Sequence, residues 1–170
     1  IVKEGLELMK HTRNTGLEAL IRATGTDPEH IKPYTIGFVL GPCLNATGRL
    51  DTADHALALF EAEDTAEAAR IAGDLKDMND SRKELTLAGV EEAIAQIEGS
   101  NLEKDDVLVV YLPDVHESLA GIIAGRIREK YNKPAFVLTR AEEGVKGSGR
   151  SIDAFHMYCL LYTSDAADDK

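Results

Sequence analysis

The chain has 170 residues, of which 44% are hydrophobic and 29% charged, and this composition predicts one ordinary globular domain or parts of two smaller ones. No apolar run approaches the roughly 18 residues of a membrane span, and the first residues lack the pattern of a signal peptide. The two cysteines lie far apart and form no CxxC pair, which excludes a disulfide framework and a zinc site. We therefore expect a soluble protein of the cytoplasm that contacts no membrane.

The net charge of −11 disfavours nucleic-acid binding at first sight, because phosphate contacts draw on clustered Lys and Arg. The charges are unevenly distributed, however. Acidic residues gather in 61–80 and 91–106, whereas the last third of the chain is rich in bases: Arg126, Arg128, Lys130, Lys133, Arg140, Lys146 and Arg150. The sequence therefore predicts a local basic face on an acidic protein.

Helices dominate the first part of the chain. Apolar spacing predicts two short helices over residues 1–24, separated at Asn14-Thr15-Gly16. After a loop from Gly25 to Pro33, residues 36–40 are too few to assign, and Gly41-Pro42 is expected to end whatever element they form. An amphipathic helix is predicted from Asp51 to about Glu61.

A much longer helix is predicted from Asp64 to Gly99, where apolar residues recur at near-helical spacing without a proline. Asp64 and Glu67 form the pattern of a capping box at its start. If continuous, this helix would span roughly 50 Å, which is typical of a connector between two domains. A break near Asn79 or Gly89 is the alternative.

The chain after Gly99 alternates between strand and helix. Residues 107–112 predict a buried strand, 118–131 an amphipathic helix, 135–139 a second strand, and 145–151 a strand or loop, with a short helix beginning near Asp153. This order predicts a sheet with helices packed on it, so the expected fold class is α/β. Within the helix, Gly121 and Gly125 lie one turn apart and are expected to admit another backbone at close range.

The segment from Lys146 to Ser151 predicts a phosphate-binding site. Gly147 and Gly149 let the backbone approach an anion, the two serines add hydroxyl donors, and Arg150 supplies a planar guanidinium that fits phosphate oxygens. A surface turn of Gly and Ser beside an Arg is also common, and that structural explanation stays open.

Two further segments are candidate sites. Residues 45–49 place the Asn45 amide and the Arg49 guanidinium on either side of a flexible glycine, with a loop and helix cap as the alternative. Asp114 to Ser118 lies between a strand and a helix, where the helix N-terminus favours anions. The alternative there is a cap formed by Asp114 or Ser118 with an exposed His116. Asp54-His55 is interpreted as solvated helix surface, because no second carboxylate cluster stands at metal-ligand spacing.

Three segments in this order resemble the RecJ family of the DHH phosphoesterase superfamily: GPCLNATGRL at residues 41–50, HESLAGIIAGR at 116–126 and GSGRS at 147–151. The likeness runs from residue 1 to about 161. It implies a C-terminal remnant of a DHH catalytic domain (1–63), a long connecting helix (64–99), a truncated DHH-associated substrate-binding domain (100–161) and a disordered or aberrant tail (162–170). The start at Ile1, without Met, likewise predicts a piece of a longer protein.

The resemblance implies a parent enzyme that degrades single-stranded DNA from the 5′ end in recombination and repair, by hydrolysis assisted by Mn²⁺ or Mg²⁺. The family's metal ligands precede the LNATGRL segment and are expected before Ile1. This chain alone is therefore expected to hold no catalytic residue, to bind no metal and to be inactive.

The resemblance also implies roles for single residues. Ser148 and Arg150 are expected to clamp the 5′ phosphate, within a loop completed by Gly147, Gly149 and Ser151. Arg49 is expected to reach a phosphate near the scissile bond, and Asn45 and His116 to support or line the same cleft. Many relatives have Arg where Cys43 stands, so one phosphate contact of the family is missing here.

Two other functions stay open. The first is a DHH phosphoesterase that acts on oligonucleotides or cyclic dinucleotides, although such relatives typically carry a glycine-and-histidine loop in place of Gly147 to Ser151. The second is a noncatalytic nucleic-acid-binding module. The expected partners are single-stranded DNA and, beyond it, a single-strand-binding protein or a helicase, and the expected state is a monomer.

Overall fold

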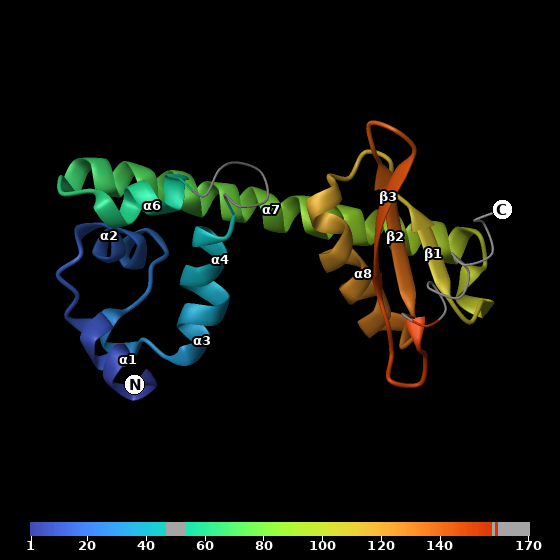
Figure 1. Cartoon of the computed structure of the whole chain (residues 1–170), viewed down its shortest axis with the longest axis horizontal. Helices are drawn as coiled ribbons and strands as arrows, with labels where there is room; N and C mark the ends of the chain where they lie inside the picture. The colour runs from blue at the N-terminus through green and yellow to red at the C-terminus, as the bar shows by residue number, and fades with distance from the viewer. Residues whose placement is uncertain (47–53, 158, 160–170) are drawn as a thin grey trace. The chain divides into compact units, whose positions relative to one another are not determined.

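The computed structural model describes residues 1–46, 54–157 and 159 (Figure 1). The chain divides into two compact units, Ile1–Lys83 and Glu84–Lys170. The helix α7 (Thr65–Gly99) contributes residues to both. The domain limits at residues 63 and 99, which the resemblance implies, stay a prediction, and the expected tail at 162–170 lies outside the described residues.

The first unit is helical. Its elements are α1 (Val2–Lys10), α2 (Thr15–Ala23), a 3₁₀ turn (Pro28–His30), α3 (Pro33–Thr35), a π-helix (Ile36–Leu40), α4 (Gly41–Leu44), α6 (Asp54–Glu61) and the start of α7. Their apolar faces meet in one core: Leu20, Ile21, Ile31, Leu40, Cys43, Leu59, Ile71, Ala72 and Leu75. The two short helices predicted over residues 1–24 are present.

Asn14 fixes the boundary between α1 and α2. Its side-chain oxygen accepts a hydrogen bond of 2.8 Å from the Leu17 N–H, which caps α2. Its side-chain nitrogen donates to the Phe60 carbonyl at 2.9 Å and so ties α2 to α6. The Leu59 carbonyl of α6 packs directly against Gly16, the second residue of α2, where a side chain would leave it no room.

The prediction that Gly41-Pro42 ends its element is wrong. Residues 33–44 are helical throughout, with a π-turn in which the Gly41 N–H donates to the Ile36 carbonyl. Proline is tolerated at the start of a helical segment because the N–H that it lacks needs no partner there. Gly41 in turn leaves room for the Ile36 carbonyl oxygen, which would lie 2.7 Å from a Cβ at this position.

A single helix, α7, runs through both Asn79 and Gly89, where the sequence left a break open. The Asp64 carboxylate accepts a hydrogen bond of 2.8 Å from the Glu67 N–H and caps its first turn. Ion pairs one turn apart support its exposed surface, such as Arg70 with Asp74 at 2.9 Å.

The second unit has a mixed three-stranded sheet with the order β1-β2-β3. Strand β1 (Leu108–Tyr111) is parallel to β2 (Ala135–Arg140), and β2 is antiparallel to β3 (Val145–Arg150). The helix α8 (Glu117–Tyr131) joins β1 to β2 and packs on the sheet (Figure 1). The predicted α/β class is thereby confirmed.

The core of the second unit lies between one face of the sheet, α8 and the C-terminal half of α7. It consists of Ala93, Ile97, Leu108, Val110, Leu112, Leu119, Ala120, Ile123, Ala124, Ile127, Ala135 and Val137. Ile123 is fully buried, and its side chain lies against Gly89 of α7, where a Cβ would come within 2.6 Å of the Ile123 Cδ1.

The prediction of a buried strand at residues 107–112 is wrong for one face of the sheet. In β1, Leu108 and Val110 point into the core, whereas Val109 and Tyr111 are 49% and 43% exposed. Among the described residues, the helices cover only the face that carries Leu108 and Val110. Residues 153 and 154 form a turn, and the first helical residue described after them is Met157, so the short helix expected near Asp153 begins later than predicted.

Candidate functional site

The predicted phosphate segment lies largely in strand β3, so its side chains point alternately to the two faces of the sheet. Lys146, Ser148 and Arg150 face α8, because Lys146 pairs with Glu117 and the other two side chains lie beside Gly121. The glycines face the other way, where Gly147 lies against the side chain of Leu138 and Gly149 against those of Phe136 and Met157. This alternation follows from the two-residue period of a strand.

Ser148 and Arg150 converge on one point beside α8. A Cβ built on Gly121 would lie 2.9 Å from Nη2 of Arg150 and 3.3 Å from Oγ of Ser148. The guanidinium is also oriented by its own strand, since Nη1 donates to the Gly149 carbonyl at 2.9 Å. No carboxylate of the described residues forms an ion pair with Arg150, and its side chain is exposed. A hydroxyl and a planar cation side by side are suited to phosphate oxygens.

His116 caps α8 from the strand side of the helix. Its Nδ1 accepts a hydrogen bond of 3.3 Å from the Ser118 N–H and lies 2.7 Å from the Ser118 hydroxyl oxygen. The alternative of a cap formed by Asp114 or Ser118 is wrong, because the cap is the His116 imidazole, although His116 is exposed as that alternative held. Because Nδ1 accepts, this geometry assigns the ring proton of neutral His116 to Nε2, which leaves an exposed N–H donor at the helix N-terminus.

A charged pair borders the same end of α8. Nζ of Lys146 lies 2.8 Å from the Glu117 carboxylate, and this hydrogen bond, with the Lys146 charge, holds the pKa of Glu117 below its usual value. The pair borders a hollow of about 640 Å³, which is lined by Val115, His116, Glu117, Arg140, Ala141, Glu142, Glu143 and Lys146. Its lining carries both signs of charge, so this hollow is no simple extension of a basic groove.

The predicted basic face is partly neutralised, because the carboxylates of Glu98, Glu117 and Glu129 contact four of its seven cations. Arg126 and Arg128 lie near Glu129, Lys130 near Glu98, and Lys146 near Glu117, while Lys133 donates to the carbonyls of Glu103 and Asp105. These contacts occupy most of the cations that the sequence placed in the last third of the chain. Arg150 is the cation of the phosphate segment that the described carboxylates leave unpaired.

The remaining predicted site residues have other surroundings or lie outside the described residues. The Ser151 hydroxyl donates to the Ile152 and Phe155 carbonyls and so closes the turn after β3. Asn45 belongs to the first unit, where its N–H donates to the Gly41 carbonyl at 2.9 Å and ends α4. Arg49 lies outside the described residues.

Sequence reasoning missed the contribution of Gly121. The sequence paired Gly121 with Gly125 as a surface for close backbone approach, but the structure gives them different surroundings. Side chains of β3 approach Gly121, whereas a Cβ on Gly125 would meet no atom within 4 Å. The available signal was a glycine within a helix otherwise rich in helix formers.

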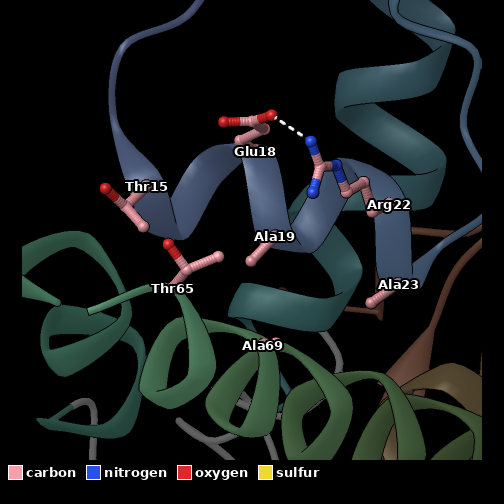
Figure 2. A pocket seen from close by; sticks show the side chains of 7 residues that line it. All are labelled: Thr15, Glu18, Ala19, Arg22, Ala23, Thr65 and Ala69. Carbon is pink, nitrogen blue, oxygen red and sulfur yellow. Dashed lines mark hydrogen bonds and ion pairs between the residues drawn. The ribbon is translucent and has the colours of Figure 1, made fainter. Parts of the chain in front are cut away.

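The first unit contains a separate hollow of about 320 Å³ between α2 and the start of α7 (Figure 2). It is lined by Thr15, Glu18, Ala19, Arg22, Ala23, Thr65 and Ala69. Figure 2 shows that the Arg22 guanidinium is directed at the Glu18 carboxylate, with which it forms an ion pair. Its one cation is therefore paired with a carboxylate, and the rest of the lining consists of alanine methyl groups and the Thr15 and Thr65 side chains.

No three His, Cys, Asp or Glu side chains of the described residues lie close enough to hold an ion, so these residues do not fit the oxygen-rich coordination that Mn²⁺ or Mg²⁺ requires. Cys43 is buried, its S–H donates to the Val39 carbonyl at 3.3 Å, and burial raises the pKa of its thiol. No described helix is long and apolar enough to cross a membrane.

Residues 104–165 match the DHHA1 domain family. Among curated proteins, the chain is 36% identical over 154 residues to the single-stranded-DNA-specific exonuclease RecJ of Salmonella typhimurium, covering 88% of this chain and 27% of that protein. It is 35% identical over 156 residues to RecJ of Bacillus subtilis, covering 91% of this chain and 20% of that protein. The chain thus spans about a quarter of the length of these relatives.

Solved structures agree with the sequence matches. The crystal structure of RecJ from Thermus thermophilus in complex with Mg²⁺ aligns with a TM-score of 0.81 and 29% identity, over 97% of this chain and 25% of that chain. A structure of exonuclease RecJ bound to manganese aligns with a TM-score of 0.80 and 30% identity, over 95% of this chain and 39% of that chain. Because the likeness extends through both units in sequence and in fold, the chain belongs to the RecJ family.

Proposed function

We propose that this chain is the substrate-holding part of a 5′-to-3′ single-stranded-DNA exonuclease that works in recombination and repair. The observation that carries the proposal is the convergence of the Ser148 hydroxyl and the Arg150 guanidinium beside Gly121. The relatives described above are named single-stranded-DNA-specific exonucleases, and two of the solved neighbours hold Mg²⁺ or manganese. These names support the assignment of the substrate class.

The pair is suited to a terminal phosphate. A 5′ phosphate presents several oxygens with negative charge, so a guanidinium can donate two parallel N–H bonds while the hydroxyl donates a third. Hydrogen bonds to charged groups contribute about 1.5–3 kcal/mol each. His116 would add an Nε2–H donor at the N-terminus of α8, where the helix dipole also favours an anion.

The glycines of the segment would serve the pair indirectly. Gly147 and Gly149 lie on the opposite face of β3 and let that strand pack closely against Leu138, Phe136 and Met157. In this arrangement they hold the strand that carries Ser148 and Arg150. Asn45 and Arg49 remain candidates for a second contact with the DNA, made by the first unit.

We assign to this chain the positioning of the substrate, and not the hydrolytic step. In the whole enzyme, Mn²⁺ or Mg²⁺ would activate water and stabilise the charge that develops on phosphorus. The residues described here would fix the end of the strand, so that successive phosphodiester bonds are presented in one register.

Binding of a short oligonucleotide tests this assignment. The chain is titrated at low salt with one single-stranded DNA carrying either a 5′ phosphate or a 5′ hydroxyl, and cleavage is monitored with Mn²⁺ present. We expect a preference for the 5′ phosphate that Arg150→Ala lowers by about tenfold or more, with no cleavage. Arg126→Ala is the matched control, because Arg126 lies beside Glu129 on α8.

The outcomes separate the alternatives. Equal affinity for the two DNA ends, or a preference that survives Arg150→Ala, would refute the role given to Ser148 and Arg150. A cyclic dinucleotide that competes better than the 5′-phosphorylated strand would instead indicate the other class of DHH phosphoesterase. Cleavage by the chain itself would refute its assignment as a noncatalytic part.

We also propose a cytoplasmic monomer that meets single-stranded DNA where a helicase unwinds it or a single-strand-binding protein covers it. The curated relatives come from bacteria and are named for this substrate, which supports the location. Sedimentation equilibrium of the chain, with and without the oligonucleotide, tests the monomer, since a concentration-dependent mass would contradict it.

A further inference from the structure

Gly121 lies in the interior of α8, where glycine is a poor choice for stability. Relative to alanine, glycine loses more backbone entropy when it joins a helix. Glycine is usually found in a helix near one of its ends or where the backbone needs a positive φ. Gly121 lies four residues into α8 and has no positive φ, so neither reason applies. The gain that offsets this loss must come from the space that the missing Cβ leaves.

That space is occupied by the ends of two side chains, and the guanidinium of Arg150 lies nearest. The atoms nearest to a Cβ on Gly121 would be Nη2 of Arg150 at 2.9 Å, Oγ of Ser148 at 3.3 Å and Cζ of Arg150 at 3.5 Å. The first distance is shorter than the ordinary van der Waals contact between a carbon and a nitrogen atom. An alanine at position 121 would therefore displace the guanidinium from its seat.

We propose that Gly121 is a positioning residue, which seats the Arg150 guanidinium beside the Ser148 hydroxyl so that both can hold one phosphate. This inference rests on the proposed function and adds to it a specificity determinant on α8. Gly121 touches no substrate in this account, since it acts through Arg150.

The surrounding structure determines which group moves when a Cβ is added at position 121. Strand β3 is held by its pairing with β2, in which Ser148 lies opposite Val137 and Arg150 opposite Ala135. Helix α8 is held from behind by the buried Ile123 and its neighbours in the core. The guanidinium is the flexible end of an exposed side chain, so it moves first while the fold stays intact.

Gly125 provides a matched control one turn along the same helix. A Cβ there would meet no atom within 4 Å, so Gly125→Ala brings the same gain in helix propensity without displacing any side chain. Both variants are expected to melt at or above the temperature of the wild-type chain. Only Gly121→Ala is expected to change the contact with phosphate.

The experiment compares the wild-type chain, Gly121→Ala, Gly125→Ala, Arg150→Ala and the double variant of Gly121 and Arg150. The probe is the oligonucleotide with a 5′ phosphate or a 5′ hydroxyl. We expect Gly121→Ala to lower the preference for the 5′ phosphate by about three- to tenfold and Gly125→Ala to leave it unchanged. In the Arg150→Ala background, Gly121→Ala should have no further effect.

A spectroscopic measurement gives a readout that loss of stability would not produce. The Arg150 side-chain Nε–Hε resonance should shift in Gly121→Ala and stay in place in Gly125→Ala, while backbone amide resonances of β2 and β3 remain near their wild-type positions. Movement of the strand resonances instead would show that the fold yields and not the guanidinium.

The outcomes distinguish this inference from the function on which it rests. Loss of 5′-phosphate preference in Arg150→Ala but not in Gly121→Ala overturns the inference alone. No loss in Arg150→Ala overturns the site, and the inference falls with it. An effect of Gly121→Ala that persists without Arg150, or a melting temperature below that of the wild type, also overturns the inference.

Discussion

Replacing Gly16 with alanine should destabilise the first unit severely, although alanine is the better helix former. A Cβ at this position would lie 1.7 Å from the Leu59 carbonyl oxygen and 2.6 Å from its carbon, whereas an ordinary carbon–oxygen contact needs about 3.3–3.6 Å. The nearest atoms belong to the backbone of α6, and no side-chain rotation relieves the clash. Helices α2 and α6 must therefore move apart.

The magnitude follows from what that movement exposes. Leu59 is 0% exposed and Ile21 2% exposed in the core between these helices, so their separation loosens apolar packing as well as the tie from Asn14 to α6. Overpacking costs about 1–3 kcal/mol and occasionally more, and a backbone clash of this depth belongs at the upper end. We expect a loss of about 3 kcal/mol, or about 12 °C or more in melting temperature for a unit of this size.

Amide hydrogen exchange is the suitable assay because it reports each helix separately. Protection should fall in α2 and α6 of Gly16→Ala and remain unchanged in α8, which serves as the internal reference. Gly73→Ala is the control within the same unit, since a Cβ there meets nothing within 4 Å, and it should stabilise by up to about 1 kcal/mol. Wild-type protection of α2 in Gly16→Ala would refute the reasoning.

Three further changes test the caps, the core and the ion pair. Asn14→Ala should cost about 1–2 kcal/mol in urea unfolding, because it removes a helix cap and a tie between helices. Ile123→Ala should cost about 2–5 kcal/mol, and Val109→Ala, on the exposed face of β1, should cost far less by the same measurement. The lowered pKa of Glu117 contributes stability above pH 4.5 that is lost as the pH falls through the folded-state value. Urea midpoints measured across acidic pH should therefore depend less steeply on pH in Lys146→Met.

The elements with strong periodicity could be predicted from the sequence. The long helix and α8 repeat apolar residues at helical spacing, strand β2 is a short apolar run after a proline, and the bounds of all three fall close to those expected. The break predicted at Asn14-Thr15-Gly16 narrows to Asn14, whose side chain caps α2, because Thr15 and Gly16 are the first residues of that helix. At these places the residue types and their spacing predict the same element, so a short stretch of sequence is enough to predict it.

The misses share a different cause. Residues 107–112 are apolar throughout, but which face of β1 is covered depends on elements far along the chain. The π-turn before Gly41-Pro42 depends on one carbonyl contact that leaves no periodic trace. The cap of α8 is an imidazole, a group that is not among the common N-caps. Each feature is decided by a tertiary contact or by an unusual partner.

The candidate site was predicted by residue type but not by arrangement. The Gly-Ser-Arg segment indicated an anion-binding site. The sequence could not show that the Ser151 hydroxyl would donate to a backbone carbonyl in the turn after β3, or that the glycines would face away from α8. It also presented Gly121 and Gly125 as equivalent. Only the pairing of β3 against β2 and α8 separates the residues that meet from those that do not.

The charge balance leads to a final prediction about the strength of DNA binding. The chain carries a net charge of −11, and Lys146, on the same face of β3 as Arg150, is held by the Glu117 carboxylate. Binding through Arg150 and at most one further cation would neutralise one or two phosphates. For single strands, each neutralised phosphate adds about 0.7 to the magnitude of the slope of log K against log salt concentration.

We therefore expect a slope magnitude of about 0.7–1.4 for the 5′-phosphorylated oligonucleotide, measured by titration from low to physiological salt. A basic groove that contacts six phosphates would give a magnitude of about 4 by the same relation. A steep slope would mean that the ion pairs on α8 open and their cations bind DNA, and Glu117→Gln should then increase affinity. A shallow slope that falls towards zero in Arg150→Ala would instead show that the electrostatic attraction comes from one guanidinium. An acidic chain is expected to bind DNA through those cations that no carboxylate neutralises.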